Sequence, residues 1–176
     1  LNTGATSNAN DMGIIMWRHT VKYLKDRLNM YQDFASKAKG EEVRYGARTA
    51  ILRDTFVAES EADARKIAGD CLMSAFNFAN WRGPGVYLNP GEKLDPELEA
   101  SLNDELTFDF VNERSLLFGS PDQVIGKLME LWEETNIEQV AFKCSWPGFA
   151  HEHLVRSVKL LTEEVIPEVN RRIQSR

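Results

Sequence analysis

The densest group of potential metal ligands in the sequence is His151-Glu152-His153. Residues two positions apart on a helix point in different directions, so these two imidazoles would not share a ligand face. Their spacing also differs from the His-Glu-x-x-His pattern that binds zinc on a helix. We therefore predict no metal site in this chain.

Cys71 and Cys144 are the only cysteines, and each lies among apolar residues. This favours two free thiols in a reducing cytoplasm, with a single disulfide as the alternative. The formal net charge of −6 argues against a nucleic-acid surface. No apolar run approaches the roughly 20 residues of a membrane span, and no secretory leader is visible. The sequence therefore predicts a cytoplasmic protein that binds neither nucleic acid nor a membrane.

Two expected helix starts carry small polar residues that suit a phosphate group, because helix N-termini attract phosphate. At residues 119–121, Gly-Ser-Pro, the next residue Asp122 would repel a phosphate. Ser120 is better interpreted as an N-cap, with Gln123 completing a capping box. Thr6, Ser7 and Asn8 could hold a phosphate through hydroxyl and backbone N–H groups, although Asp11 favours a plain helix cap here too.

The elements that would position such residues follow from the hydrophobic pattern. Apolar residues at three- and four-residue spacing, from Met16 and Trp17 to Ala35, predict one long helix that ends at Gly40. Residues 47–58 predict a buried strand, and the helix after it begins at Ser60.

Beyond residue 78 the pattern weakens and then returns. Turn signals and one expected short helix, over residues 95–103, occupy the segment 78–117. Residues 120–136 predict a helix, residues 138–144 a second strand, and the final helix contains Pro167, which should kink or split it.

Strands that alternate with helices are typical of parallel α/β packing. Only two strands are predicted here, and a two-stranded parallel sheet is not a stable core. We therefore expect that the complete fold has further strands outside this chain.

Two stretches give the sequence a resemblance to a known family. Residues 48–68, RTAILRDTFVAESEADARKIA, are similar to the seventh strand and following helix of luciferase-like flavin-dependent monooxygenases. Residues 118–169 resemble the closing portion of that family, with a Gly-Ser-Pro-Asp-Gln-Val helix start, an apolar eighth strand, a Pro-Gly and a Glu-Glu-Val-Ile-Pro ending in the expected order.

The resemblance implies a partial (β/α)8 TIM barrel, an α/β fold of which this chain holds only the last strands and helices. Residues 1–176 would form a single partial domain. In the family, the earlier strands carry most flavin contacts and any catalytic histidine, so the resemblance assigns no catalytic residue here.

Active sites of such barrels lie at the C-terminal ends of the strands. The resemblance therefore places Cys144, Ser145, Trp146 and Phe149 at the barrel mouth as cofactor-binding candidates. Trp146 and Phe149 could line an apolar pocket over an isoalloxazine ring, or they could plug the end of the barrel. The segment 78–117 corresponds to a mobile flap of the family, which predicts a lid; packing against the outside of the barrel is the alternative.

The implied function is a flavin-dependent monooxygenase that uses reduced FMN and O2 to oxidise a small apolar organic substrate, this chain being its C-terminal part. A flavin reductase could supply the reduced cofactor. A deazaflavin-dependent oxidoreductase is a close alternative, because the same barrel serves both. A non-catalytic flavin-binding or structural remnant, completed by self-association or by a missing N-terminal half, is a second hypothesis, and an unrelated small α/β domain is a third.

Overall fold

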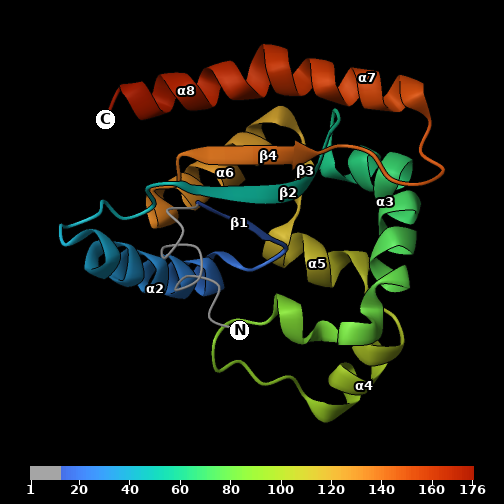
Figure 1. Ribbon diagram of the computed structural model, residues 1–176. Coiled ribbons are helices and arrows are strands. Elements are labelled where there is room, and N and C mark those ends of the chain that lie inside the picture. The colour runs from blue at the N-terminus through green and yellow to red at the C-terminus, as the bar shows by residue number, and fades with distance from the viewer. Residues whose placement is uncertain (1–12) are drawn as a thin grey trace.

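The computed structural model describes residues 13–176, which fold as an α/β structure around a parallel sheet (Figure 1). The strands are β1 (Ile14–Trp17), β2 (Thr49–Val57), β3 (Leu117–Gly119) and β4 (Gln139–Lys143). The helices are α2 (Val21–Lys39), α3 (Glu61–Phe78), α4 (Pro96–Asp104), α5 (Phe108–Ser115), α6 (Pro121–Thr135), α7 (His151–Leu160) and α8 (Ile166–Gln174). None of the described helices is long and apolar enough to cross a membrane.

Strand β2 is the hub of the sheet, because it pairs in parallel with all three other strands. Its first half pairs with β1 and β4, and its last three residues pair with β3. The direct pairing of β2 with β4 agrees with the predicted assignment of these segments to consecutive strands of a barrel.

Alternation along the strands gives the sheet two different faces. On the helix-covered face, Ile51 of β2 packs against Leu24 and Leu28 of α2 and Leu131 of α6. Further along this face Val57 packs against residues of α6 and of the C-terminal helices: Val124, Leu128, Leu161 and Val165. The other face, which we call the open face, carries Ile15, Trp17, Leu52, Asp54 and Lys143. Ile15 is 64% exposed and Trp17 39% exposed.

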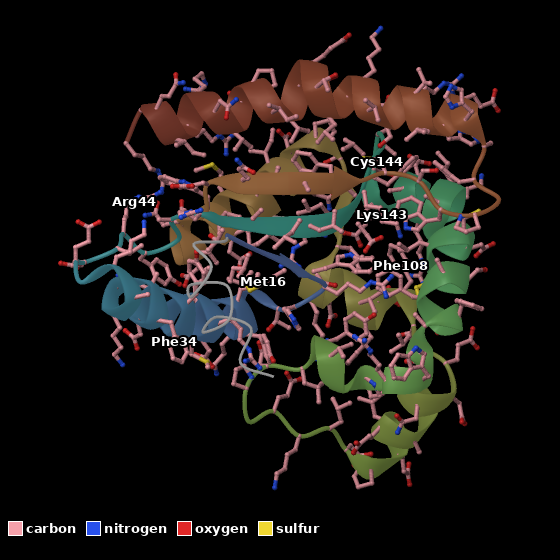
Figure 2. All side chains as sticks on the ribbon, viewed as in Figure 1. Met16, Phe34, Arg44, Phe108, Lys143 and Cys144 are labelled. Carbon is pink, nitrogen blue, oxygen red and sulfur yellow. The ribbon has the colours of Figure 1, made fainter. Side chains whose placement is uncertain are left out.

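Residues 13–176 contain four strands, where the sequence predicted two. Met16 (Figure 2) and Trp17, which were assigned to the long helix, lie instead in β1. Arg18 follows with a φ of 67°, and the side chain of Thr20 accepts a hydrogen bond from Tyr23 N to start α2. The prediction was wrong because Met16 and Trp17 happen to continue the apolar spacing of the helix that follows them. A strand of only four residues is too short to show its own alternation.

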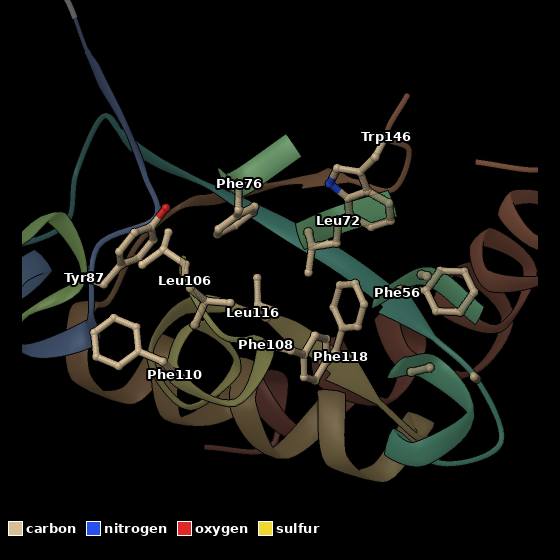
Figure 3. Packing of buried hydrophobic residues seen from close by; sticks show 14 of the residues in the cluster. Phe56, Leu72, Phe76, Tyr87, Leu106, Phe108, Phe110, Leu116, Phe118 and Trp146 are labelled. Carbon is tan, nitrogen blue, oxygen red and sulfur yellow. The ribbon is translucent and has the colours of Figure 1, made fainter. Parts of the chain in front are cut away.

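The segment 78–117 is more regular than predicted, since it contains α4, α5 and two short 3-10 helices, Asn80–Arg82 and Pro84–Tyr87. Its apolar side chains pack against α3 and the end of the sheet in one large cluster (Figure 3). The cluster includes Phe56, Leu72, Phe76, Tyr87, Leu106, Phe108, Phe110, Leu116, Phe118 and Trp146. The side chains of Asp95 and Thr107 cap the two helices, so each begins at a residue with a local reason to start it.

For two of the remaining predicted helices, the residues expected to cap them are confirmed. Ser60 caps α3, Ser120 and Gln123 form the capping box of α6, and Asn136 ends that helix in the left-handed conformation. Pro167 was expected to kink or split the final helix, and it lies in the first turn of α8, directly after an interruption of the α-helical pattern. A π-helical turn, Leu161–Val165, joins α7 to α8, and the three form one continuous rod along the sheet (Figure 1).

Candidate functional site

A buried carboxylate, Asp54, lies near the C-terminal end of β2, with a side chain only 1% exposed. Its Oδ1 accepts hydrogen bonds from Trp146 Nε1 at 2.9 Å and from Lys143 Nζ at 3.2 Å. Its Oδ2 accepts a hydrogen bond from Trp17 Nε1 at 2.9 Å, and Arg18 Nε lies 3.6 Å away in an ion pair. A charge buried this deeply is stable because both of its oxygens are paired.

Three adjacent strand ends position this group. Trp17 ends β1 and Arg18 follows it. Asp54 lies opposite Lys143 in the register of β2 and β4, and Trp146 follows in the next turn. Since the carboxyl ends of parallel strands meet at one edge of a sheet, these side chains converge although they are far apart in sequence. The same edge of an α/β barrel carries its active site.

Arg18 connects the carboxylate to the aromatic cluster. Its guanidinium carbon lies 3.7 Å from the Phe76 ring centroid and 4.0 Å from that of Trp17, both cation–π distances. Its Nη1 donates a hydrogen bond to Tyr87 Oη at 3.5 Å. Burial raises the pKa of Tyr87, and the charge of Arg18 opposes this shift in part. The phenol therefore remains protonated at neutral pH.

His19 follows Arg18 and stacks on Tyr23 at a centroid distance of 4.3 Å. Burial is the main cause that lowers the pKa of His19. A hydrogen bond with the backbone of Val86 opposes this shift, and nearby Arg53 and Arg27 lower the pKa further. The imidazole is therefore neutral at pH 7. Its Nδ1 has no hydrogen-bond partner among the described residues.

The four predicted cofactor-binding residues are divided between the two faces. Trp146 and Phe149 meet edge-on at 5.7 Å, and Phe149 packs against Phe56 at 5.4 Å. Cys144 (Figure 2) instead packs against the cluster of α6 and the π-helical turn on the helix-covered face, where burial raises its pKa to about 11 and the charge of Asp54 adds to the shift. Ser145 is exposed.

Trp146 is only 4% exposed, so protein side chains cover most of its indole. The accessible indole of the site is that of Trp17, which reasoning from the sequence placed in a helix. Asp54, Arg18 and Lys143 were also missed. A signal for Asp54 was present, because acidic and basic residues are almost never buried in a strand unless they are paired.

Other sequence predictions concern residues away from this group. Both cysteines are free thiols, so the disulfide alternative is wrong. Within residues 13–176, no three His, Cys, Asp or Glu side chains are grouped as metal ligands would be. Thr6, Ser7 and Asn8 lie outside the described residues.

A parallel sheet with outer helices and polar side chains at its C-terminal edge is the architecture of part of an α/β barrel. No family model matches the chain. The curated 2,5-diketocamphane 1,2-monooxygenase 1 of Pseudomonas putida is 26% identical over 136 residues, which are 70% of this chain and 34% of that protein.

The chain also matches parts of larger proteins whose structures are solved. The oxygenating constituent of 3,6-diketocamphane monooxygenase from Pseudomonas putida, in complex with FMN, matches with a TM-score of 0.69 and 19% identity, over 93% of this chain and 44% of that one. The coenzyme F420-dependent tetrahydromethanopterin reductase from Methanopyrus kandleri matches with a TM-score of 0.61 and 16% identity, over 94% of this chain and 48% of that one.

The chain has the luciferase-like monooxygenase fold, which confirms the resemblance predicted from its sequence. It spans about a third of the curated relative and less than half of these two structures, and is therefore a partial barrel.

Proposed function

We propose that this chain is the C-terminal part of a flavin-dependent monooxygenase that uses reduced FMN and O2 to oxidise a small apolar organic substrate. The observation that carries the proposal is the group on the open face. There an accessible indole, Trp17, lies beside two cations, Arg18 and Lys143, at the edge where such barrels hold their cofactor.

These residues fit a flavin in two respects. The exposed indole of Trp17 offers a flat surface for an isoalloxazine ring. The side chain of Lys143 is 32% exposed and its Nζ lies 5.3 Å from the Trp17 ring centroid, so a ligand on this indole can reach a cation. The bound cofactor would supply the oxygen chemistry.

Each residue of the group around Asp54 has its own role in this proposal. Asp54 fixes the two indoles and the two cations, so Trp17 and Arg18 are held in one orientation before a ligand arrives. Trp146 and Phe149 pack edge-on against each other beside this group, and Lys143 Nζ lies near the rings of both Trp17 and Trp146. Arg18 and Lys143 together outweigh the charge of Asp54, which favours an anionic reduced flavin.

The segment 78–117 is proposed as the lid. Its base is held in the aromatic cluster, whereas Phe78 and Trp81 are 92% and 80% exposed. Two large apolar side chains at the exposed start of the segment are available to cover an apolar substrate. The substrate and O2 would be its small-molecule partners, a flavin reductase its protein partner, and the missing N-terminal half would supply the rest of the barrel.

A deazaflavin is the second candidate cofactor, because the fold matches the F420-dependent reductase as well as the FMN-binding oxygenase. The planar ring of a deazaflavin would use the same indole.

Titration of FMN and coenzyme F420 into the protein, followed by the fluorescence of each cofactor, tests these proposals. We expect saturable quenching of one cofactor, and a Trp17→Leu variant should weaken that binding about tenfold through loss of ring contact. Trp132→Leu, on the helix-covered side, is the matched control and should bind as the parent does. Quenching of neither cofactor, or equal effects of the two substitutions, would contradict a flavin site on the open face.

A further inference from the structure

A cavity of about 910 Å³ lies on the helix-covered side of the sheet, on the opposite face from Asp54. Helices α2, α5 and α6 contribute most of its lining, and Arg53 and Leu117 line it from the sheet. Arg53 follows Ile51 by two positions in β2, so both side chains point to this face. The cavity is therefore separate from the proposed flavin site.

Arg53 is the unusual residue of the cavity. It is only 3% exposed, and burial lowers its pKa to about 10. Its Nη1 is buried and has no hydrogen-bond partner among the described residues. The charge of Asp54 opposes this lowering of the pKa, but its oxygens are hydrogen-bonded to Trp17, Trp146 and Lys143 on the other face. A buried guanidinium in this state is costly unless an anion joins it.

Lys127 is a second cation lining the same cavity. Its Nζ donates hydrogen bonds to Asn112 Oδ1 and to the carbonyl oxygen of Phe118, both at 3.0 Å, and both acceptors are neutral. Burial lowers the pKa of Lys127, while the charge of Glu61 acts in the opposite direction. An ammonium has three donor hydrogens, so one remains for a ligand.

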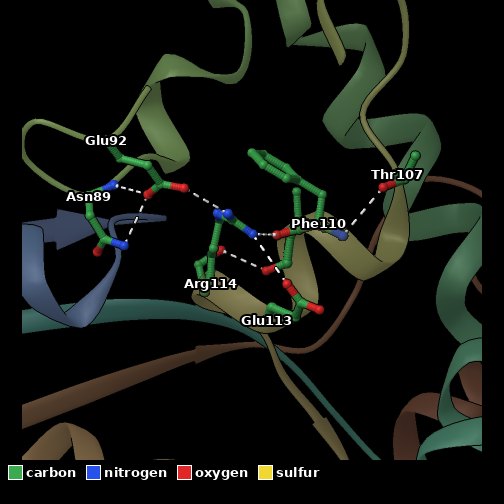
Figure 4. Close-up of polar contacts among 8 residues, drawn as sticks. Asn89, Glu92, Thr107, Phe110, Glu113 and Arg114 are labelled. Carbon is green, nitrogen blue, oxygen red and sulfur yellow. Dashed lines mark hydrogen bonds and ion pairs between the residues drawn. The ribbon is translucent and has the colours of Figure 1, made fainter. Parts of the chain in front are cut away.

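The other basic residues that line the cavity are neutralised or lie at its rim. Lys25 pairs with Glu134, and Arg114 pairs with Glu92, which also accepts hydrogen bonds from Asn89 (Figure 4). The exposed residues of the lining include three acids, Asp26, Glu113 and Glu130. The cavity thus combines a buried cation, Arg53, and a half-buried cation, Lys127, with an acidic rim. Neither cation has a carboxylate within ion-pair distance among the described residues, a pattern that admits one anionic group and repels a polyanion.

We propose that this cavity binds a small molecule through a single phosphate group, held by the guanidinium of Arg53 and the ammonium of Lys127. A phosphate monoester carries a charge of about −1.5 to −2 at pH 7, which two cations balance. The planar guanidinium matches phosphate oxygens in a two-pronged hydrogen bond. The acidic rim requires that the rest of the ligand be neutral or cationic.

Calorimetric titration of the protein with inorganic phosphate, at ionic strength held constant with chloride, tests this site. We expect saturable binding to one site, weakened about tenfold in Lys127→Met and in Arg53→Met, because each loses a charged hydrogen bond. Lys66→Met, an exposed residue of α3 outside the cavity, changes the net charge equally and should bind as the parent does. If Arg53→Met does not fold, Arg53→Lys replaces it in this test. This variant retains the charge, but it should also weaken binding because lysine cannot make the two-pronged hydrogen bond of a guanidinium.

Absence of saturable phosphate binding, or equal affinities in Lys127→Met and Lys66→Met, would overturn the proposal. The site does not depend on the proposed flavin function. Trp17→Leu should leave the phosphate titration unchanged, so failure at one face is distinguishable from failure at the other.

Discussion

Asp54 of β2 receives hydrogen bonds or an ion pair from four side chains, which lie at or just beyond the ends of β1 and β4. We expect Asp54→Asn to lower the free energy of unfolding by about 3 kcal/mol, because it leaves Arg18 and Lys143 without their shared counter-ion. Urea denaturation at pH 7 measures this change. Asp70→Asn, at an exposed position of α3, is the control and should change stability by less than about 0.5 kcal/mol. Equal losses in the two variants would show that the charge of Asp54 is not important for the fold.

The raised pKa of the Cys144 thiol predicts how its reactivity changes with pH. Because burial raises its pKa from 9.0 to about 11, the thiol is protonated at pH 8 and should react slowly with iodoacetamide. Its labelling rate in a Cys71→Ser variant, followed by mass spectrometry, should rise about tenfold per pH unit until the pH approaches 11. The raised pKa also means that this thiol stabilises the fold below about pH 9 and loses that contribution as the pH rises to 11. Rapid labelling of the native protein at pH 8 would contradict this burial.

The elements that sequence reasoning predicted well are long or well capped. Strand β2 has nine residues, and α3 and α6 begin at Ser60 and Ser120, whose side chains cap them. Strands β1 and β3 have four and three residues, which is too short for a periodic signal. They are strands because β2 pairs with them, and that information is not local in the sequence.

The candidate site was also predictable only where it follows a strand with a clear sequence pattern. Trp146 and Phe149 could be placed near the group around Asp54 because they follow a recognisable strand, β4, and their cofactor-binding role stays a prediction. Trp17 and Arg18 were missed because the strand before them was missed. Cys144 was placed at the mouth by its position in the chain, but its side chain alternates to the helix-covered face. To predict which residues line a site at a strand end, the face to which each side chain points is therefore needed as well as its position in the chain.

Ser157 of α7 joins the C-terminal rod to the hub strand, since its hydroxyl oxygen accepts a hydrogen bond from Val57 N at 2.8 Å. The residue is 1% exposed. Ser157→Ala would leave a buried N–H without a partner, and we expect a loss of about 2 kcal/mol in urea denaturation. Ser101→Ala, at an exposed position of α4, provides the comparison and should be nearly neutral. A neutral Ser157→Ala would mean that the rod is held by its apolar contacts alone.

At the scale of the whole molecule, the exposed apolar side chains of β1 agree with the partial length of the chain. Parallel sheets are normally covered on both faces, yet Ile15 is 64% exposed on the open face. The chain spans 34% of its curated relative, so we expect the remaining strands of a complete barrel to cover this surface. The sequence predicted this incompleteness by counting strands, although it counted too few.

The role of β2 as the hub of the sheet has a consequence for the order of folding. Contacts between distant parts of a chain form later than local ones, because closing a longer loop costs more entropy. Trp17 and Asp54 are 37 positions apart, whereas Lys143 and Asp54 are 89 apart. The β1–α2–β2 unit is therefore the expected nucleus, and β4 joins it last. The carboxylate would first receive the indole of Trp17 and only later Lys143 and Trp146, so the proposed site becomes complete in the final step of folding.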